Sequence, residues 1–375
     1  MKITFIGISG YELPHTRVRC YHFARILKEK HGFDTEVLSY KQDLAKNLSE
    51  EEMWNLDLCS RINLNLKAYK ALKNEKRLIY LQKIHYHSAS TILLNRYRNY
   101  PYVFDYDDYD IELSVFFQNH WINKFVFGTS NYLQATKRIS ENASTCIAAS
   151  HFLKDFLTQW NSKTFLVPTG MDSDRFPCKE YRNNDNIVKL GWVGIVWGEQ
   201  IYHNVLFILE VFEKVYKECQ NTELVLVGGG IFMKYVKNCI NTIYSDLPIS
   251  VIPQVKYEEV PSLLQSFDIG LFPLIQQSPW AWSKSPTKVF EYLSSGLAVV
   301  ASNNGEVSYL IEDGLTGFKA NDLDEFVEKT INLVRDKDLR VRIGKNASLV
   351  AINEYSLNAL DKNLVSVLQD TLSRI

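Results

Sequence analysis

The feature that most constrains this chain is an alternation of short apolar runs with amphipathic helical patterns, sustained through almost all of its 375 residues. Continuous apolar runs are typical of parallel strands that are covered on both faces. In the first half they read KITFIGI, TEVLSY, RLIYLQ, PYVFDY, STCIAAS and TFLVPT, at residues 2–8, 35–40, 77–82, 101–106, 144–150 and 164–169. Helical patterns fall between these runs, so the sequence predicts a doubly wound α/β fold.

The alternation breaks at residues 177–186, a polar, turn-rich stretch that we interpret as a linker. It restarts with apolar runs at residues 187–195, 222–230, 248–255, 267–274 and 297–302. The sequence thus predicts two Rossmann-like domains facing a central cleft, at residues 1–178 and 179–355. A last helix at residues 356–375 is predicted to pack back toward the first domain. In such folds ligands bind at the carboxyl ends of the parallel strands.

Composition excludes several classes of protein. A formal net charge of -1 argues against a globally basic nucleic-acid binder, so no nucleic-acid partner is predicted. The six cysteines contain no C-x-x-C pair, which indicates neither a zinc site nor a disulfide framework. The N-terminal apolar run is too short for a signal peptide, and no window approaches about 20 apolar residues. These features predict a cytoplasmic protein.

Residues 283–296, SKSPTKVFEYLSSG, predict a short helix with Ser285 as N-cap and Gly296 as its left-handed stop. Lys284 and Lys288 then crowd the positive end of the helix dipole, where carboxylates are normally favoured. A bound phosphate would remove this conflict, and Glu291, about one turn deeper, could accept hydrogen bonds from ribose hydroxyls. The alternative is a solvated helix face on which Lys288 pairs with Glu291.

A buried strand follows and runs into Asn304, Gly305 and a second helical segment. A second helix N-terminus beside the first would favour a diphosphate. A turn made only for compactness remains the alternative.

At this point the residues carry a family resemblance. Residues 266–318 resemble the donor-binding signature of glycosyltransferase family 4, the retaining nucleotide-sugar glycosyltransferases of GT-B fold. VPTGMDSDRF, at residues 167–176, is similar to the end of that family's N-terminal domain, and LGWVGI resembles the start of its C-terminal domain. The resemblance implies an acceptor-binding first domain and a donor-binding second domain. It implies hexosyl transfer, with retention, from a UDP- or GDP-sugar to a glycan, lipid-linked or protein acceptor, in cell-surface polysaccharide or glycoconjugate synthesis. No metal or other cofactor is implied.

The resemblance also assigns residues of the donor site. Glu291 matches the family's ribose-binding glutamate, whereas the family's sugar-binding glutamate falls at Ser283, so Trp280, Trp282 or Ser283 is expected to replace it. The family's usual Arg and Lys after the first strand of the second domain are absent here. Lys284 and Lys288 are the expected replacements, with the donor site completed by Gly194, Asn304 and Gly305.

The first domain offers candidate acceptor residues. Gly10 follows the first predicted strand, and Arg17 and Arg19 begin the next helix, which suggests a phosphate of the donor or of a lipid-phosphate acceptor. The alternative is a role in surface solubility.

VFDYDDYD places Asp105, Asp107, Asp108 and Asp110 at a strand end, where carboxylates raise one another's pKa or bind a cation. We assign Asp105 and Asp108 to acceptor positioning or proton handling, beside Lys288 and Glu291 as catalytic candidates. The same Asp-x-Asp also fits a metal-dependent transferase of GT-A fold, which activity loss in EDTA and rescue by Mn²⁺ would reveal.

Two stretches, residues 66–88 and 116–127, interleave basic with aromatic residues and suit an anionic membrane surface. A peripheral contact with the cytoplasmic face of the membrane is therefore predicted, beside the alternative of an ordinary helix face and core. Two other functions also remain open: a UDP-sugar epimerase of GT-B fold, and a non-catalytic sugar-nucleotide-binding subunit that needs a partner.

Overall fold

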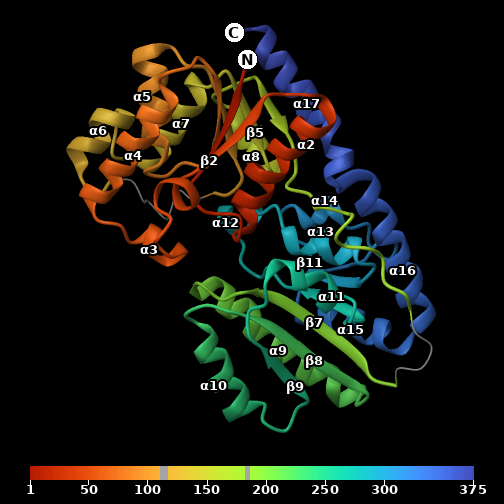
Figure 1. The fold of residues 1–375 in the computed structure, drawn as a ribbon. Coiled ribbons are helices and arrows are strands. Elements are labelled where there is room, and N and C mark those ends of the chain that lie inside the picture. Colours follow the sequence, from red (N-terminus) through yellow and green to blue (C-terminus); the bar gives the residue numbers. More distant parts are fainter. Residues whose placement is uncertain (110–116, 182–185) are drawn as a thin grey trace. The chain divides into compact units, whose positions relative to one another are not determined.

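The computed structural model describes residues 1–109, 117–181 and 186–375 and divides into two compact units. The first comprises Met1–Gly170, Ser283–Ser285 and Leu357–Ile375, and the second comprises Met171–Trp282 and Pro286–Ser356. Both ends of the chain thus belong to the first unit (Figure 1). Residues 171–178, which the sequence assigned to the first domain, lie in the second unit.

The first unit is built on a parallel sheet of six strands, in the order β2-β1-β3-β4-β5-β6. Its strands are β1 (Ile3–Gly7), β2 (Thr35–Ser39), β3 (Leu78–Gln82), β4 (Tyr102–Tyr106), β5 (Thr145–Ala148) and β6 (Thr164–Leu166). The helical segments of this unit are α1 (Pro14–Thr16), η1 (Arg17–His22), α2 (Phe23–His31), η2 (Tyr40–Leu44), α3 (Glu50–Trp54), α4 (Leu58–Leu72), α5 (Ser88–Arg98), α6 (His120–Phe127), α7 (Tyr132–Asn142), α8 (His151–Thr158) and α17 (Leu357–Ser373).

Two apolar cores cover this sheet because its strands carry apolar side chains on both faces. One core joins Ile79 and Leu81 of β3 to helices α4, α5 and α7. The other joins Phe5 and Tyr80 to α2 and to α17, which contributes Leu357, Leu364, Val367 and Leu368. Helix α17 is thus a structural part of the first unit.

The second unit has a parallel sheet of six strands in the order β12-β11-β10-β7-β8-β9. Its strands are β7 (Val188–Ile195), β8 (Thr222–Gly229), β9 (Ile249–Ile252), β10 (Ile269–Phe272), β11 (Ala298–Ser302) and β12 (Phe318–Ala320). The helical segments are α9 (Glu199–Glu218), α10 (Met233–Ile243), η4 (Tyr257–Glu259), α11 (Val260–Leu264), α12 (Pro279–Trp282), α13 (Thr287–Ser294), α14 (Val307–Leu310), α15 (Leu323–Arg335), α16 (Lys337–Val350) and η5 (Ala351–Tyr355).

The two doubly wound α/β sheets confirm the predicted fold class, and eleven of the twelve strands in the described residues lie within the predicted apolar runs. The exception is β12, a three-residue strand at the sheet edge that no predicted run covered.

The helix predicted at residues 283–296 also forms, as α13, and Gly296 ends it with φ of 73°. The N-cap prediction was wrong, because α13 begins at Thr287 and the Ser285 hydroxyl instead accepts a hydrogen bond from the Thr169 backbone N–H at 3.1 Å. Among the described helices, none has the length and apolar character needed to cross a bilayer.

Candidate functional site

The carboxyl end of β7 carries a lysine from another element of the second unit. Lys288 lies in the first turn of α13, and its Nζ is 4.7 Å from the centroid of the Trp192 ring. A Cβ atom at Gly194 would lie only 2.3 Å from this Nζ, so glycine leaves the space that the ammonium group uses. The structure therefore brings together two residues of the predicted donor site, Gly194 and Lys288.

Glu291 follows Lys288 by about one helical turn and is 8% exposed. The helix is held in place by the side chains of Val289, Phe290 and Leu293, each with no exposed surface. This anchoring fixes the direction in which Lys288 and Glu291 leave the backbone. A lysine and a carboxylate one turn apart on a packed helix can bind a phosphate and a hydroxyl of one ligand.

The loop after β11 contains Asn304 and Gly305. The Asn304 side-chain amide donates to the carbonyl oxygens of Leu274 and Gln276, at 2.8 and 2.7 Å, and so fixes the loop after β10. Gly305 has φ of 54°, and a Cβ atom there would lie 2.9 Å from Trp282 Cα. The Asn304 amide therefore anchors this loop. Glycine is favoured at position 305 because the backbone is left-handed there and leaves no room for a Cβ atom. The short helix that follows, α14, has four residues.

In the first unit Arg19 and Asp105 form a fully buried ion pair. The Arg19 Nε donates to Asp105 Oδ2 at 2.9 Å, Nη2 donates to Asp105 Oδ1, and Nη1 donates to the Val167 carbonyl at 2.6 Å. Both side chains have no exposed surface. This pairing satisfies both groups, and it favours a structural role over the phosphate contact predicted for Arg19 and the acceptor contact predicted for Asp105.

The two aspartates that follow have opposite environments. Asp108 accepts from Lys83 Nζ at 3.2 Å and from Lys284 Nζ at 2.5 Å, and the two ammonium groups hold its pKa well below the usual range. Asp107 accepts from Gln82 Nε2 at 2.9 Å, but burial raises its pKa to about 7. Its Oδ1 is buried, accepts no hydrogen bond from a described residue and lies 3.8 Å from Lys83 Nζ. Asp107, which the sequence analysis did not select, therefore has a raised pKa where that of Asp108 is lowered.

Lys83 itself holds an unusual backbone conformation. It is buried, and its φ of 64° lies in the left-handed region that a residue with a Cβ atom rarely adopts. Its backbone N–H donates to the Asp105 carbonyl at 2.8 Å, which ties the end of β3 to β4. Such strain is concentrated at functional sites. The apolar run ending at Gln82 gave no signal for it.

Three consecutive residues, Ser283, Lys284 and Ser285, belong to the first unit. The Ser283 hydroxyl accepts from the Tyr109 N–H at 3.2 Å, and Lys284 pairs with Asp108. Lys284, predicted to bind the diphosphate beside Lys288, has its ammonium group on Asp108 in this structure. Its role toward the diphosphate stays a prediction.

The loop after β1 is also occupied by protein groups. The Gly10 N–H donates to Glu50 Oε1 at 2.8 Å, so a carboxylate already accepts from this backbone group. Arg17 is buried, and its Nη1 donates to the Glu12 carbonyl at 3.0 Å. The carboxylate of Glu50 would repel an anion bound at Gly10. The phosphate role of Gly10 and Arg17 stays a prediction.

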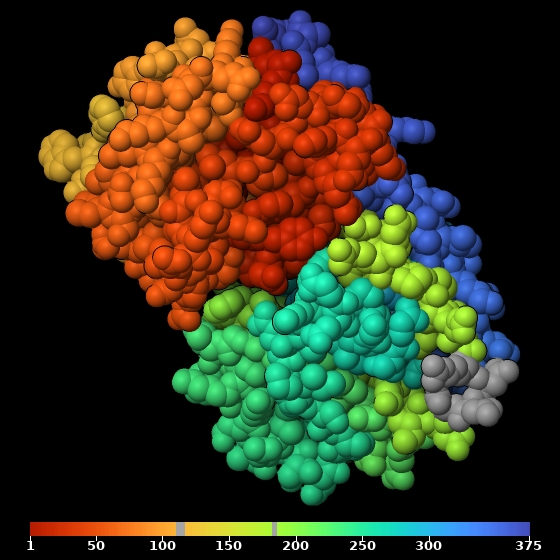
Figure 2. All heavy atoms as spheres, viewed as in Figure 1, coloured from red at the N-terminus to blue at the C-terminus, as the bar shows by residue number. Residues whose placement is uncertain are grey.

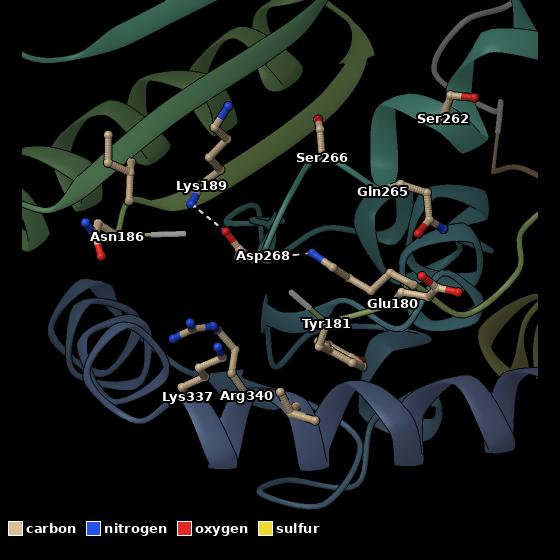
Figure 3. A pocket seen from close by; sticks show the side chains of 13 residues that line it. Glu180, Tyr181, Asn186, Lys189, Ser262, Gln265, Ser266, Asp268, Lys337 and Arg340 are labelled. Atoms are coloured by element: carbon tan, nitrogen blue, oxygen red, sulfur yellow. Dashed lines mark hydrogen bonds and ion pairs between the residues drawn. The ribbon is translucent and has the colours of Figure 1, made fainter. Parts of the chain in front are cut away.

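A pocket of about 560 Å³ lies at the other end of the second sheet (Figure 3). Asp268 is at its centre, with Lys179 Nζ at 3.2 Å and the Lys189 backbone N–H at 2.9 Å. Asp268 directly precedes β10 and Lys189 lies near the start of β7. Because ligands of open α/β sheets bind at the carboxyl ends of the strands, this pocket does not coincide with the predicted donor site.

The acidic strand end does not form a cluster of three ligands for a metal ion among the residues that the structure describes. The lysine and arginine partners of Asp105 and Asp108 explain this, since they occupy the carboxylate oxygens that a cation would need. The fourth predicted aspartate, Asp110, lies outside the described residues.

Comparison with known proteins gives a family match for part of the chain. Residues 188–336 match the family described as glycosyl transferases group 1. The trehalose synthase of Thermococcus litoralis is 26% identical over 154 residues, which cover 39% of this chain and 36% of that protein. The match thus spans about a third of the length of that relative.

Similarity to solved structures extends over the whole chain. Sucrose-phosphate synthase from Thermosynechococcus elongatus has a TM-score of 0.76 at 14% identity, covering 100% of both chains. Anabaena HepE, solved in complex with UDP and glucose, has a TM-score of 0.68 at 18% identity, covering 99% of this chain and 100% of that one. The chain therefore has the GT-B fold, and its residues 188–336 match the glycosyl transferases group 1 family.

Proposed function

We propose that this protein is a glycosyltransferase that moves a hexosyl group from a nucleotide diphosphate sugar to an acceptor hydroxyl, with retention of the anomeric configuration. The observation that carries the proposal is Lys288 beside Gly194, at the carboxyl end of β7 within the group 1 domain. Anabaena HepE has the same fold and was solved in complex with UDP and with UDP-glucose. These complexes support a UDP-sugar as the first donor to test.

The chemical task is to stabilise the leaving diphosphate, whose negative charge grows as the glycosidic bond breaks. Lys288 would supply a fixed positive charge there, and the Trp192 ring under its ammonium group limits where that charge can go. Glu291 would accept hydrogen bonds from the ribose hydroxyls. The loops held by Asn304 and Gly305 would close the same side of the site. No metal ion is part of this proposal, and the acceptor is a glycan, a lipid-linked sugar or a protein.

The test is transfer by the purified full chain from a panel of UDP- and GDP-hexoses, with Lys288→Ala as the diagnostic variant. Loss of one preorganised charge should lower kcat/KM by about 10²- to 10³-fold. Glu291→Gln should weaken nucleotide binding, since it replaces the charged acceptor with an amide. The matched control is Lys217→Ala, because Lys217 is exposed on α9 and pairs only with Glu213 among the described residues.

Three results would contradict the proposal. Near-normal transfer by Lys288→Ala would show that the donor diphosphate does not bind at Lys288. Release of free nucleotide and an altered free sugar without an acceptor-linked product would indicate an epimerase. An inverted anomeric centre, read by NMR of the product, would exclude retention. Persistence of activity in EDTA is expected, whereas loss with recovery on adding Mn²⁺ would require a metal.

A further inference from the structure

Helix α6 exposes two large aromatic side chains on one face. Trp121 is 76% exposed and Phe125 is 61% exposed, and a spacing of four residues places them side by side. The opposite face of α6 is buried through Asn123, Val126 and Phe127. Trp121 has the highest exposed fraction of the large hydrophobic residues that the structure describes. The two rings are thus exposed to solvent on a helix whose other face is packed against the unit.

The exposure is not the result of a loose helix end. The Asn119 side chain caps α6 by accepting hydrogen bonds from the backbone N–H groups of Trp121 and Ile122, at 3.0 and 3.1 Å. At the other end, Arg96 of α5 donates to the carbonyl oxygens of Phe125 and Val126, at 2.6 and 2.8 Å. Both ends are fixed, so the aromatic face keeps one orientation. Such a pair on one rigid face is a candidate contact surface.

Positively charged side chains belong to the same part of the first unit. Lys124 lies between them in sequence, and its Nζ is 5.9 Å from the centroid of the Trp121 ring. Arg138 is exposed on α7 and forms no ion pair with any described residue. The carboxylate of Glu141, also on α7, is already paired with Lys137 at 3.8 Å. This part of the unit therefore combines exposed aromatic side chains with cations that form no ion pair with described residues.

A pocket of about 360 Å³ lies beside the end of α6. Apolar side chains of Ile92, Phe127 and Ile139 contribute to its lining, together with the guanidinium-bearing side chains of Arg96 and Arg138. A pocket that is partly apolar and carries two guanidinium groups suits an amphiphile with an anionic head. Figure 1 shows α6 at the margin of the first unit beside α5, and in Figure 2 spheres in the gold of residues near 120 stand out at the left margin.

We propose that the α6 surface, defined as Trp121, Lys124, Phe125, Arg96 and Arg138, docks the protein on an anionic lipid bilayer. A Trp side chain is favoured in the headgroup region of a bilayer because its ring is amphipathic. A Phe side chain beside it can be buried at the boundary with the acyl chains. Lysine and arginine beside them are attracted to the surface potential of acidic lipids. The charge of the surface favours this occupant over a second copy of the chain, which would bring like charges together. The inference does not depend on the proposed transfer reaction.

The experiment is co-sedimentation of the full chain with phosphatidylcholine vesicles and with vesicles that also contain phosphatidylglycerol. Binding is expected only to the anionic vesicles, and it should weaken as salt is raised. Trp121→Ala combined with Phe125→Ala should lower the partition coefficient by about tenfold or more. Arg138→Glu should lower it by at least about fivefold, because it removes one cation near the surface and adds an anion.

The matched control is Ile243→Ser in the second unit. Ile243 is 68% exposed and lies outside the proposed α6 surface. It should bind vesicles like the unmodified protein. The thermal unfolding midpoint of every variant should stay close to that of the parent, since the substituted side chains are exposed. Equal binding to neutral and anionic vesicles, or unchanged binding of the Trp121 and Phe125 variant, would overturn the proposal. Light scattering that shows a dimer lost only in this variant would assign the face to self-association instead.

Discussion

At the scale of single residues, the neighbours of a carboxylate decide its chemistry. Asp105, Asp107 and Asp108 lie within four positions of the sequence, yet their environments differ completely. Asp105 is neutralised by Arg19, and Asp108 by Lys83 and Lys284, whereas burial raises the pKa of Asp107 to about 7. The sequence predicted an acidic strand end but selected Asp105 and Asp108. It could not identify Asp107, because each partner comes from a distant part of the chain.

The Asp107 carboxyl predicts a defined pH dependence of stability. Its pKa is raised on folding, from an ordinary value of 3.8 to about 7, so the folded chain binds a proton that the unfolded chain releases. The contribution of this proton to stability is complete below about pH 4 and is lost as pH rises through about 7. One pKa unit corresponds to about 1.4 kcal/mol, which sets an upper bound on the order of 4 kcal/mol for this group.

Asp107→Asn should therefore flatten the dependence of the unfolding free energy on pH between about 4 and 7, measured by urea unfolding at several pH values. Asp108→Asn should act in the opposite sense, since the pKa of Asp108 is lowered and its charge stabilises the fold above about pH 4. An Asp107→Asn variant with the same pH slope as the parent would show that Asp107 is ionised in the folded protein.

At the scale of elements, the close approach of α13 to β7 depends on a glycine in β7, Gly194, which has no side chain. A Cβ atom at Gly194 would meet both Lys288 Nζ at 2.3 Å and the Trp192 ring at 2.6 Å. Gly194→Ala should therefore displace the ammonium group and raise the Kd for the nucleotide by about tenfold, measured by calorimetry. Gly198→Ala is the control, because the nearest atom to a Cβ there is 3.7 Å away. Equal nucleotide affinity of both variants would show that Lys288 does not bind the ligand.

The elements themselves were largely predictable, and the failures have physical causes. Buried parallel strands such as β3 and β11 are apolar throughout, so their positions follow from the apolar runs. Strand β12 has only three residues, with Lys319 at its centre. It lies at a sheet edge, where two of its side chains are only partly buried, so its sequence is not a continuous apolar run. The predicted N-cap failed for a different reason. The Ser285 hydroxyl is bonded to Thr169, a contact that no local pattern contains.

At the scale of the whole molecule, α17 determines whether the first unit has a complete core. Leu357, Leu364, Val367 and Leu368 of this helix are at most 4% exposed. Each fully buried aliphatic side chain contributes about 1.5–3 kcal/mol, against a typical total stability of 5–15 kcal/mol. Removal of residues 357–375 should therefore unfold the first unit.

This prediction is checked by limited proteolysis of the truncated chain, which should cut the first unit at sites that are protected in the parent. Removal of Ile375 alone is the control, because its side chain is 40% exposed. If the truncated chain resists protease as well as the parent does, α17 is not needed for the first unit to stay folded.

The membership of α17 in the first unit has a consequence for synthesis. A ribosome makes the strands of the first sheet early and this helix only after the whole second unit. During that interval the face of the first sheet that carries Phe5 and Tyr80 has no cover from α17. The second unit, in contrast, is continuous from Met171 to Ser356 apart from three residues, so it can fold as it emerges. The half of the protein that is translated first is thus the half that finishes folding last.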